Sequence, residues 1–156
     1  MEKINSYLGM ADNDFAFASG GMRTCSELGV YNSIASLCAQ ACEKYLKAII
    51  ELCFADHQEL KSLLRTHNLR TLYNVINKRY DLGVTTKDCK WVGDFYFDAR
   101  YPGDDFVEVT FDDATECLAI TEKLKDVAHV IVGEERKKRE ESQTQLKKLA
   151  AFLGGE

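Results

Sequence analysis

Apolar residues recur every three or four positions along most of this 156-residue chain, with polar residues between them. This spacing is that of one buried face of an α-helix. It predicts a first helix over residues 4–18, ended by Gly20 and Gly21, and a longer one over residues 31–55. After an interruption, the same spacing returns over residues 69–80 and predicts a third helix.

Two more helices are predicted from threonines that precede apolar stripes. Thr85 or Thr86 suits the N-cap of a helix that runs to about residue 100. The sequence "TFDD" places Thr110 as an N-cap with Asp113 three residues later, a carboxylate variant of the capping box. The apolar stripe that follows comprises Ala114, Cys117, Leu118, Thr121, Leu124, Ala128 and Ile131.

These elements predict an all-α fold, an antiparallel up-and-down bundle of four to five helices with a long C-terminal helix. The bundle is expected to occupy residues 1–133. Residues 134–145 contain no apolar side chain, and "LKKLAAFL" then returns a short apolar stripe. We therefore expect residues 134–156 to form either a charged helical extension or a frayed tail.

Composition narrows the class of protein. No segment approaches the roughly 20 apolar residues of a membrane span, and the N-terminus is acidic rather than basic, so we expect a cytoplasmic protein. The six cysteines form no CxxC pair, which favours buried reduced thiols, with no metal and no cofactor. The net charge of −5 argues against nucleic-acid binding through bulk charge.

The stretch "DARYPGDD", residues 98–105, contains the only proline and is the first candidate site. Its Pro-Gly pair fits a type II turn, so the preceding helix is predicted to end at Arg100. A cation in that position can simply satisfy the last carbonyl groups of the helix. Alternatively, the Arg100 guanidinium binds a phosphate, flanked by Tyr96 and Tyr101, whose rings can stack on a base.

Two other groups of polar residues are candidates. His67 lies in a polar connection, where it is either a surface residue or a proton carrier beside Arg65. Glu43, Lys44 and Lys47 share one side of the second helix, and Glu43 can reach Lys47 one turn later. An exposed, salt-bridged helix face is the default interpretation of that group.

Taken together, these stretches resemble the HEPN domain family. "YLGMADNDFAFA" resembles its first helix, and "AQACEKYLKAII", residues 39–50, is similar to its glutamine–acid–lysine helix. "THNLRTL", residues 66–72, and "YFDARYP", residues 96–102, resemble its histidine and Arg-Tyr-Pro segments. The resemblance covers roughly residues 3–132.

The resemblance implies a bundle that commonly dimerises and often binds nucleotides or RNA. Many members pair with a small nucleotidyltransferase in a toxin–antitoxin-like system. The ribonuclease branch carries an arginine followed four to six residues later by a histidine. This chain lacks that pair, since the histidine after Arg100 is His129.

The sequence therefore favours a non-catalytic, homodimeric binding module that docks a nucleotidyltransferase-like protein and binds a nucleotide or RNA phosphate in a cleft near Arg100. The residues expected to line or border this cleft are Glu43, Lys44, Lys47, His67, Tyr96, Arg100 and Tyr101. One alternative is a metal-independent ribonuclease that uses Arg100, His67 and Tyr101. Another is a structural partner whose tail, residues 146–153, docks in a groove.

Overall fold

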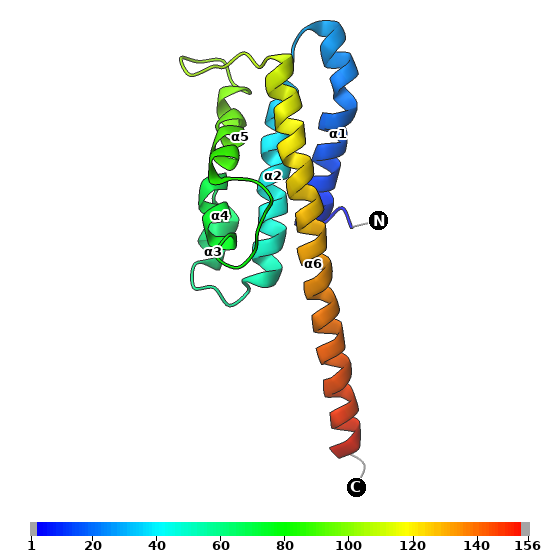
Figure 1. The fold of residues 1–156 in the computed structure, drawn as a ribbon. Coiled ribbons are helices and arrows are strands. Elements are labelled where there is room, and N and C mark those ends of the chain that lie inside the picture. The colour runs from blue at the N-terminus through cyan, green and yellow to red at the C-terminus, as the bar shows by residue number, and fades with distance from the viewer. Residues whose placement is uncertain (1–2, 154–156) are drawn as a thin grey trace.

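The computed structural model describes residues 3–153, and the regular structure in this part of the chain is helical. The helices are α1 (Tyr7–Leu28), α2 (Asn32–Cys53), α3 (Leu60–Arg65), α4 (Leu69–Ile76), α5 (Thr86–Asp98) and α6 (Phe111–Leu153). Figure 1 shows the bundle and the length by which α6 projects beyond it. The all-α prediction with a long C-terminal helix is confirmed.

Helix α2 is the centre of the bundle. It contacts each of the other five helices, with α1 and α6 on one side and α3, α4 and α5 on the other (Figure 1). A helix covered in this way is buried around most of its circumference. The fully buried side chains of α2 include Ile34, Tyr45, Leu46, Ile49 and Ile50.

Helix α1 is longer than the sequence pattern predicts, and the predicted stop at Gly20 and Gly21 is wrong. The helix continues to Leu28, where Gly29 caps it with a positive φ of 70°. Glycine in a helix interior costs about 1 kcal/mol relative to alanine. Gly21 sits where α1 approaches α2, since a Cβ there would lie 3.1 Å from Ile34 Cδ1. Packing of α1 against α2 at Gly21 therefore accompanies the continuation of the helix past both glycines.

The predicted N-caps of the later helices are found in the structure. Thr85, not Thr86, caps α5 in a capping box with Asp88. At the start of α6, the Asp113 backbone N–H donates to Thr110 Oγ1 at 3.1 Å, and the Thr110 N–H donates to Asp113 Oδ2 at 2.9 Å. Both boxes satisfy backbone donors that a helix start leaves without intrahelical partners.

The C-terminal part of α6 extends away from the bundle (Figure 1). Residues 134–153 are helical, whereas residues 154–156 of the predicted extension lie outside the described part of the chain. The apolar side chains of this extension are exposed, and they include Leu146, Leu149, Phe152 and Leu153. Among the described helices, none is long and apolar enough to cross a membrane.

Burial of Glu43 and Lys47 corrects the interpretation of the α2 polar stripe as an exposed face. Glu43 is 7% exposed and Lys47 is 4% exposed. The Lys47 Nζ donates to Glu43 Oε1 at 2.6 Å, which confirms the predicted contact across one helical turn. These charges are buried because α2 is covered on so many sides. Lys44 pairs instead with Asp14 of α1.

Four of the cysteines lie in the core around α2. Cys38 and Cys42 of α2, Cys89 of α5 and Cys117 of α6 are fully buried as free thiols. Burial raises the pKa of Cys38 to about 11 and that of Cys89 to about 12. These groups pack as small apolar side chains and stay protonated at neutral pH.

The buried ion pair makes a testable prediction about stability. Lys47→Met leaves the Glu43 carboxylate buried without its cation, which costs about 3–5 kcal/mol of unfolding free energy. The double substitution Glu43→Leu with Lys47→Met removes both charges, and we expect most of that stability to return. Urea denaturation followed by circular dichroism measures both. Equal losses in the single and double variants would contradict the interpretation.

Candidate functional site

The connection between α3 and α4 meets the last turns of α5 through two stacked rings. Asn68 caps α4 by accepting a hydrogen bond from the Thr71 N–H at 3.0 Å, which fixes the backbone beside His67. The His67 and Tyr96 rings then stack, with centroids 5.0 Å apart and an interplanar angle of 27°. Residues that are far apart in sequence are therefore in contact here.

The buried Glu43 carboxylate of α2 contacts His67 from the interior of the bundle. Glu43 Oε2 lies 3.0 Å from His67 Nδ1, while the other carboxylate oxygen accepts from Lys47. A carboxylate only accepts, so Nδ1 carries the proton in this contact. The His67 side chain is 52% exposed, and within residues 3–153 its Nε2 makes no hydrogen bond. The arrangement directs one fixed face of the imidazole outward.

Arg100 holds Tyr96 from another direction. Its guanidinium carbon lies 5.4 Å from the centre of the Tyr96 ring, and its Nε donates to Ser36 Oγ at 3.2 Å. Within the described part of the chain, Arg100 makes no side-chain bond to a carbonyl of its own helix, as simple capping would require. The side chain therefore ties the end of α5 to α2. We call the two stacked rings of His67 and Tyr96, together with the Arg100 guanidinium beside Tyr96, the aromatic column.

The turn after Arg100 differs from the sequence-based prediction. Helix α5 ends at Asp98, and Arg100 follows in the turn. A type II turn needs a positive φ at its glycine, but among the described residues only Gly29 and Gly83 have one. The hydrogen-bonded turn lies further on, where the Phe106 N–H donates to the carbonyl of Gly103 at 3.1 Å.

Five of the predicted site residues form a series of contacts, which we call the contact chain, and two others, Lys44 and Tyr101, lie outside it. Lys44 is engaged by Asp14. Tyr101 stacks on Phe97 at 6.4 Å and is 56% exposed. The contact chain itself joins Glu43, Lys47, His67, Tyr96 and Arg100.

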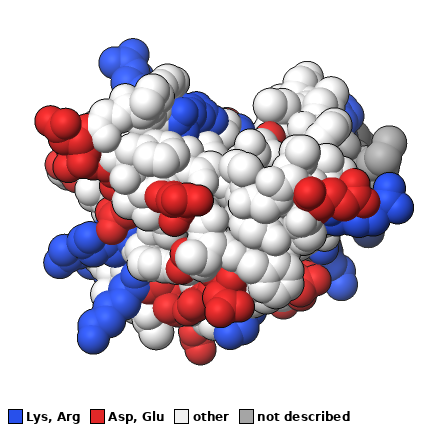
Figure 2. Space-filling view, turned by 90° about the horizontal axis from the view of Figure 1, so that it is seen from above, with Lys and Arg blue, Asp and Glu red and all other residues white. Residues whose placement is uncertain are grey.

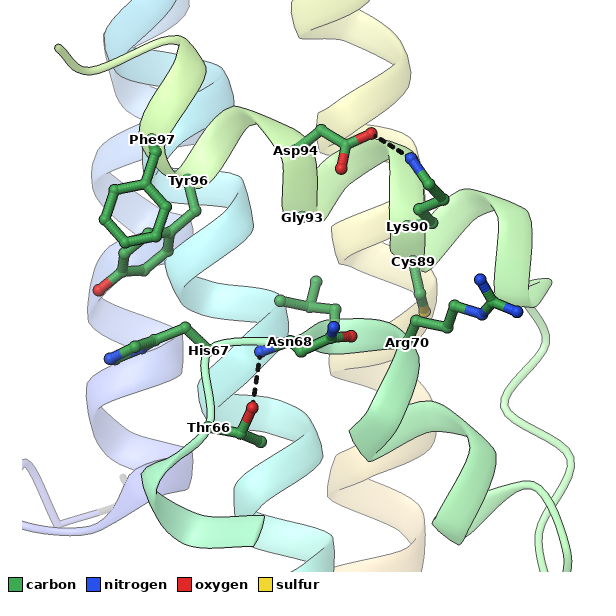
Figure 3. Close-up of a pocket in the computed structure, with 11 residues that line it drawn as sticks. Thr66, His67, Asn68, Arg70, Cys89, Lys90, Gly93, Asp94, Tyr96 and Phe97 are labelled. Carbon is green, nitrogen blue, oxygen red and sulfur yellow. Dashed lines mark hydrogen bonds and ion pairs between the residues drawn. The ribbon is translucent and has the colours of Figure 1, made fainter. Parts of the chain in front are cut away.

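A pocket of about 460 Å³ opens between α4 and α5, beside the His67–Tyr96 stack (Figure 3). Its lining residues are Thr66, His67, Asn68, Leu69, Arg70, Cys89, Lys90, Gly93, Asp94, Tyr96 and Phe97. Arg100 is not in the wall, and the loop with the proline does not border it. A volume of this size suits a small organic ligand.

Most of these lining residues were not predicted from the sequence. Arg70, Lys90, Gly93 and Asp94 lie on helix positions that pattern analysis leaves as ordinary surface. The available signal was spacing, because positions three and four apart on α5 share a face. The spacing indicates a pocket only once it is known that α4 lies opposite this face of α5.

Charge is unevenly distributed around the site. Lys90 Nζ lies 2.8 Å from Asp94 Oδ2 in an exposed pair, so these two groups largely offset each other. The segment around Arg100 is acidic, with Asp98, Asp104, Asp105, Glu108 and Asp112. Figure 2, which views the molecule from above, shows a mostly uncharged surface with acidic and basic groups both scattered around it. That end offers no continuous basic surface.

A second polar cluster, away from the pocket, joins three helices. Tyr45 of α2 donates its hydroxyl to Asp12 Oδ1 of α1 at 2.8 Å, and His129 Nε2 of α6 lies 2.8 Å from the same oxygen. Burial, and secondly the bond to Asp12, raises the pKa of Tyr45. The buried hydroxyl is therefore satisfied as a donor, and the cluster fastens α1 and α6 to the central helix.

Comparison with known proteins identifies the family of the chain. The family model described as HEPN domain matches residues 20–131, which span the last part of α1, all of α2 to α5 and the first part of α6. The segment that resembles the first helix of the family, residues 7–18, lies before the matched region. No curated protein matches the chain, and no solved structure matches it. The chain belongs to the HEPN domain family.

Proposed function

We propose that this HEPN domain is a non-catalytic binding module that takes a nucleotide, free or at an RNA end, into the pocket beside the aromatic column. The observation that carries the proposal is the His67–Tyr96 stack at 5.0 Å on the edge of that pocket. Aromatic edges, a fixed imidazole and nearby guanidinium groups are the groups with which proteins bind bases and phosphates.

His67 and Tyr96 are each held by neighbouring side chains of the bundle. The Glu43–Lys47 pair holds the imidazole, and the Arg100 guanidinium, which donates to Ser36, lies over the Tyr96 ring. A binding surface that is ordered before the ligand arrives loses less conformational entropy on binding. In this proposal Arg100 is a positioning residue, because it lies outside the pocket wall.

We propose that the domain is not catalytic because the residues at the pocket lack the groups that RNA cleavage needs. Acid–base cleavage of RNA needs proton-transfer groups within hydrogen-bond reach of one phosphate. The pocket wall contains one histidine, His67, and the chain has no arginine followed four to six residues later by histidine. The Nε of Arg100 is engaged by Ser36.

A ribonuclease remains the alternative because of one observation. The Glu43–His67 contact at 3.0 Å resembles the carboxylate–imidazole arrangement that orients a general base. In that alternative, His67 Nε2 takes the proton of a 2′-hydroxyl, whose oxygen bonds to phosphorus while the bond to the 5′-oxygen breaks and that oxygen takes a proton from water. Arg100 stabilises the charge on the phosphate.

The proposed homodimer is supported by exposed apolar surface on α1. Phe17 is 68% exposed, and it lies beside a shallow hollow lined by Ala16, Gly20 and Gly21. In an antiparallel pair of α1 helices, Phe17 of each copy enters the hollow of the other copy. The hollow lies about one helical turn along α1 from Phe17, so both contacts form at once. Such an isologous contact closes a two-fold dimer. Docking to a nucleotidyltransferase-like protein, through the α6 extension, is proposed as a separate contact.

Nucleotide binding is tested by isothermal titration calorimetry with AMP, GMP, CMP and UMP. We expect the wild type to bind at least one of them. Tyr96→Ala should weaken that binding about tenfold or more, because base–aromatic contact is worth about 1–3 kcal/mol. Arg100→Ala should weaken it less. Phe152→Ala, an exposed aromatic on the α6 extension, is the control. Absence of all binding contradicts the proposal.

RNA cleavage distinguishes the alternative. We expect no cleavage of a labelled single-stranded RNA by wild-type protein in the presence of a chelator. Cleavage that disappears in His67→Ala but persists in His57→Ala would establish the ribonuclease and refute the non-catalytic assignment. His57 is the matched control because it lies at a different pocket, beside Phe54.

The dimer is tested by light scattering coupled to gel filtration. We expect a mass of twice the 17.6 kDa of the chain. Phe17→Glu should give a monomer with unchanged helical content, since a carboxylate in the apolar hollow is costly to bury. Phe152→Glu should leave the dimer intact. A dimer that survives Phe17→Glu would show that another surface pairs.

A further inference from the structure

We infer that the pocket between α4 and α5 takes a mononucleotide in one orientation, with its phosphate at Arg70 and its base against Tyr96 and Phe97. This inference rests on the proposed function and assigns the class and direction of the ligand within that site. It also assigns the anion contact to Arg70, a residue outside the contact chain that joins Glu43 to Arg100.

The two ends of the pocket differ in chemistry. Figure 3 shows the Arg70 side chain at one end and His67, Tyr96 and Phe97 at the other, with Asn68 between them. The Tyr96 and Phe97 rings meet edge to face at 4.7 Å, and Phe97 is 56% exposed. One end therefore offers aromatic surface and the other a guanidinium, as a base and a phosphate require.

Arg70 is the cation in the wall that has no counter-ion. Within residues 3–153, no ion pair, hydrogen bond or ring contact engages its guanidinium, whereas Lys90 beside it is paired with Asp94 at 2.8 Å. An unpaired guanidinium presents its full fork of donors, which matches two oxygens of a phosphate. The phosphate end of the ligand therefore belongs at Arg70.

Gly93 lies in the pocket wall, close to Leu69 of α4. It lies in the interior of α5, where glycine is disfavoured relative to residues with a side chain. A Cβ at this position would reach 3.5 Å from Leu69 Cβ, an ordinary contact, so a side chain is not excluded by the backbone. Helices α4 and α5 therefore approach closely at this position, and a methyl group here would fill part of the pocket floor against Leu69.

A mononucleotide fits better than an RNA chain. Proteins that bind single strands without sequence preference follow the backbone with a basic groove. Here Asp94 lies in the wall, and the chain carries a net charge of −5. A volume of about 460 Å³ holds one nucleotide-sized ligand.

The test compares AMP with adenosine by titration calorimetry on the full chain. Arg70→Gln should raise the dissociation constant for AMP about tenfold or more, because a charge-assisted contact is lost, while adenosine binding stays unchanged. Arg65→Gln is the matched control, an exposed arginine five residues earlier that does not line the pocket. Gly93→Ala should weaken both ligands. Circular dichroism checks that each variant is folded.

The outcomes separate this inference from the proposed function. If Tyr96→Ala weakens AMP binding but Arg70→Gln and Arg65→Gln bind AMP alike, the site stands and the orientation is overturned. Equal weakening of AMP and adenosine by Arg70→Gln also overturns it. Tighter binding of a tetranucleotide RNA than of AMP overturns the mononucleotide class. If the wild type binds no nucleotide, the proposed function fails, and this inference with it.

Discussion

The Glu43 carboxylate is the interaction on which the candidate site depends. One of its oxygens accepts from Lys47 at 2.6 Å within α2, and the other meets His67 at 3.0 Å from the α3–α4 connection. A buried charge is tolerated only when it is paired and hydrogen-bonded. The same group that must be neutralised in the interior therefore fixes the position of an exposed imidazole.

Helix α2 serves the core and the site at once. Its apolar residues form the centre of the bundle, and its polar residues fasten the surrounding elements: Glu43 holds His67, Ser36 holds Arg100, and Tyr45 holds Asp12. Each of these contacts joins segments that are far apart in sequence. Disturbance of α2 should therefore be felt both in stability and in the geometry of the candidate site.

The structure divides the predicted site between two roles. Tyr96 and His67 line the pocket, while Arg100 supports the Tyr96 ring from outside it. The acidic segment that follows Arg100 disfavours a polyanion at that end of the molecule, and the short ligand proposed for the pocket between α4 and α5 would avoid it. The pocket wall and the side chain that supports it from outside are thereby distinct.

The sequence by itself determined the helical class, the positions of α2 and α4 to within a few residues, and the caps of α5 and α6, because periodicity and capping are local properties. It did not determine that α1 continues through Gly20 and Gly21, or that Glu43 and Lys47 are buried. Those outcomes depend on which neighbours cover a helix. The pocket with Arg70 and Gly93 was decided only by the tertiary structure, because it forms between two helices whose relative placement no local pattern records.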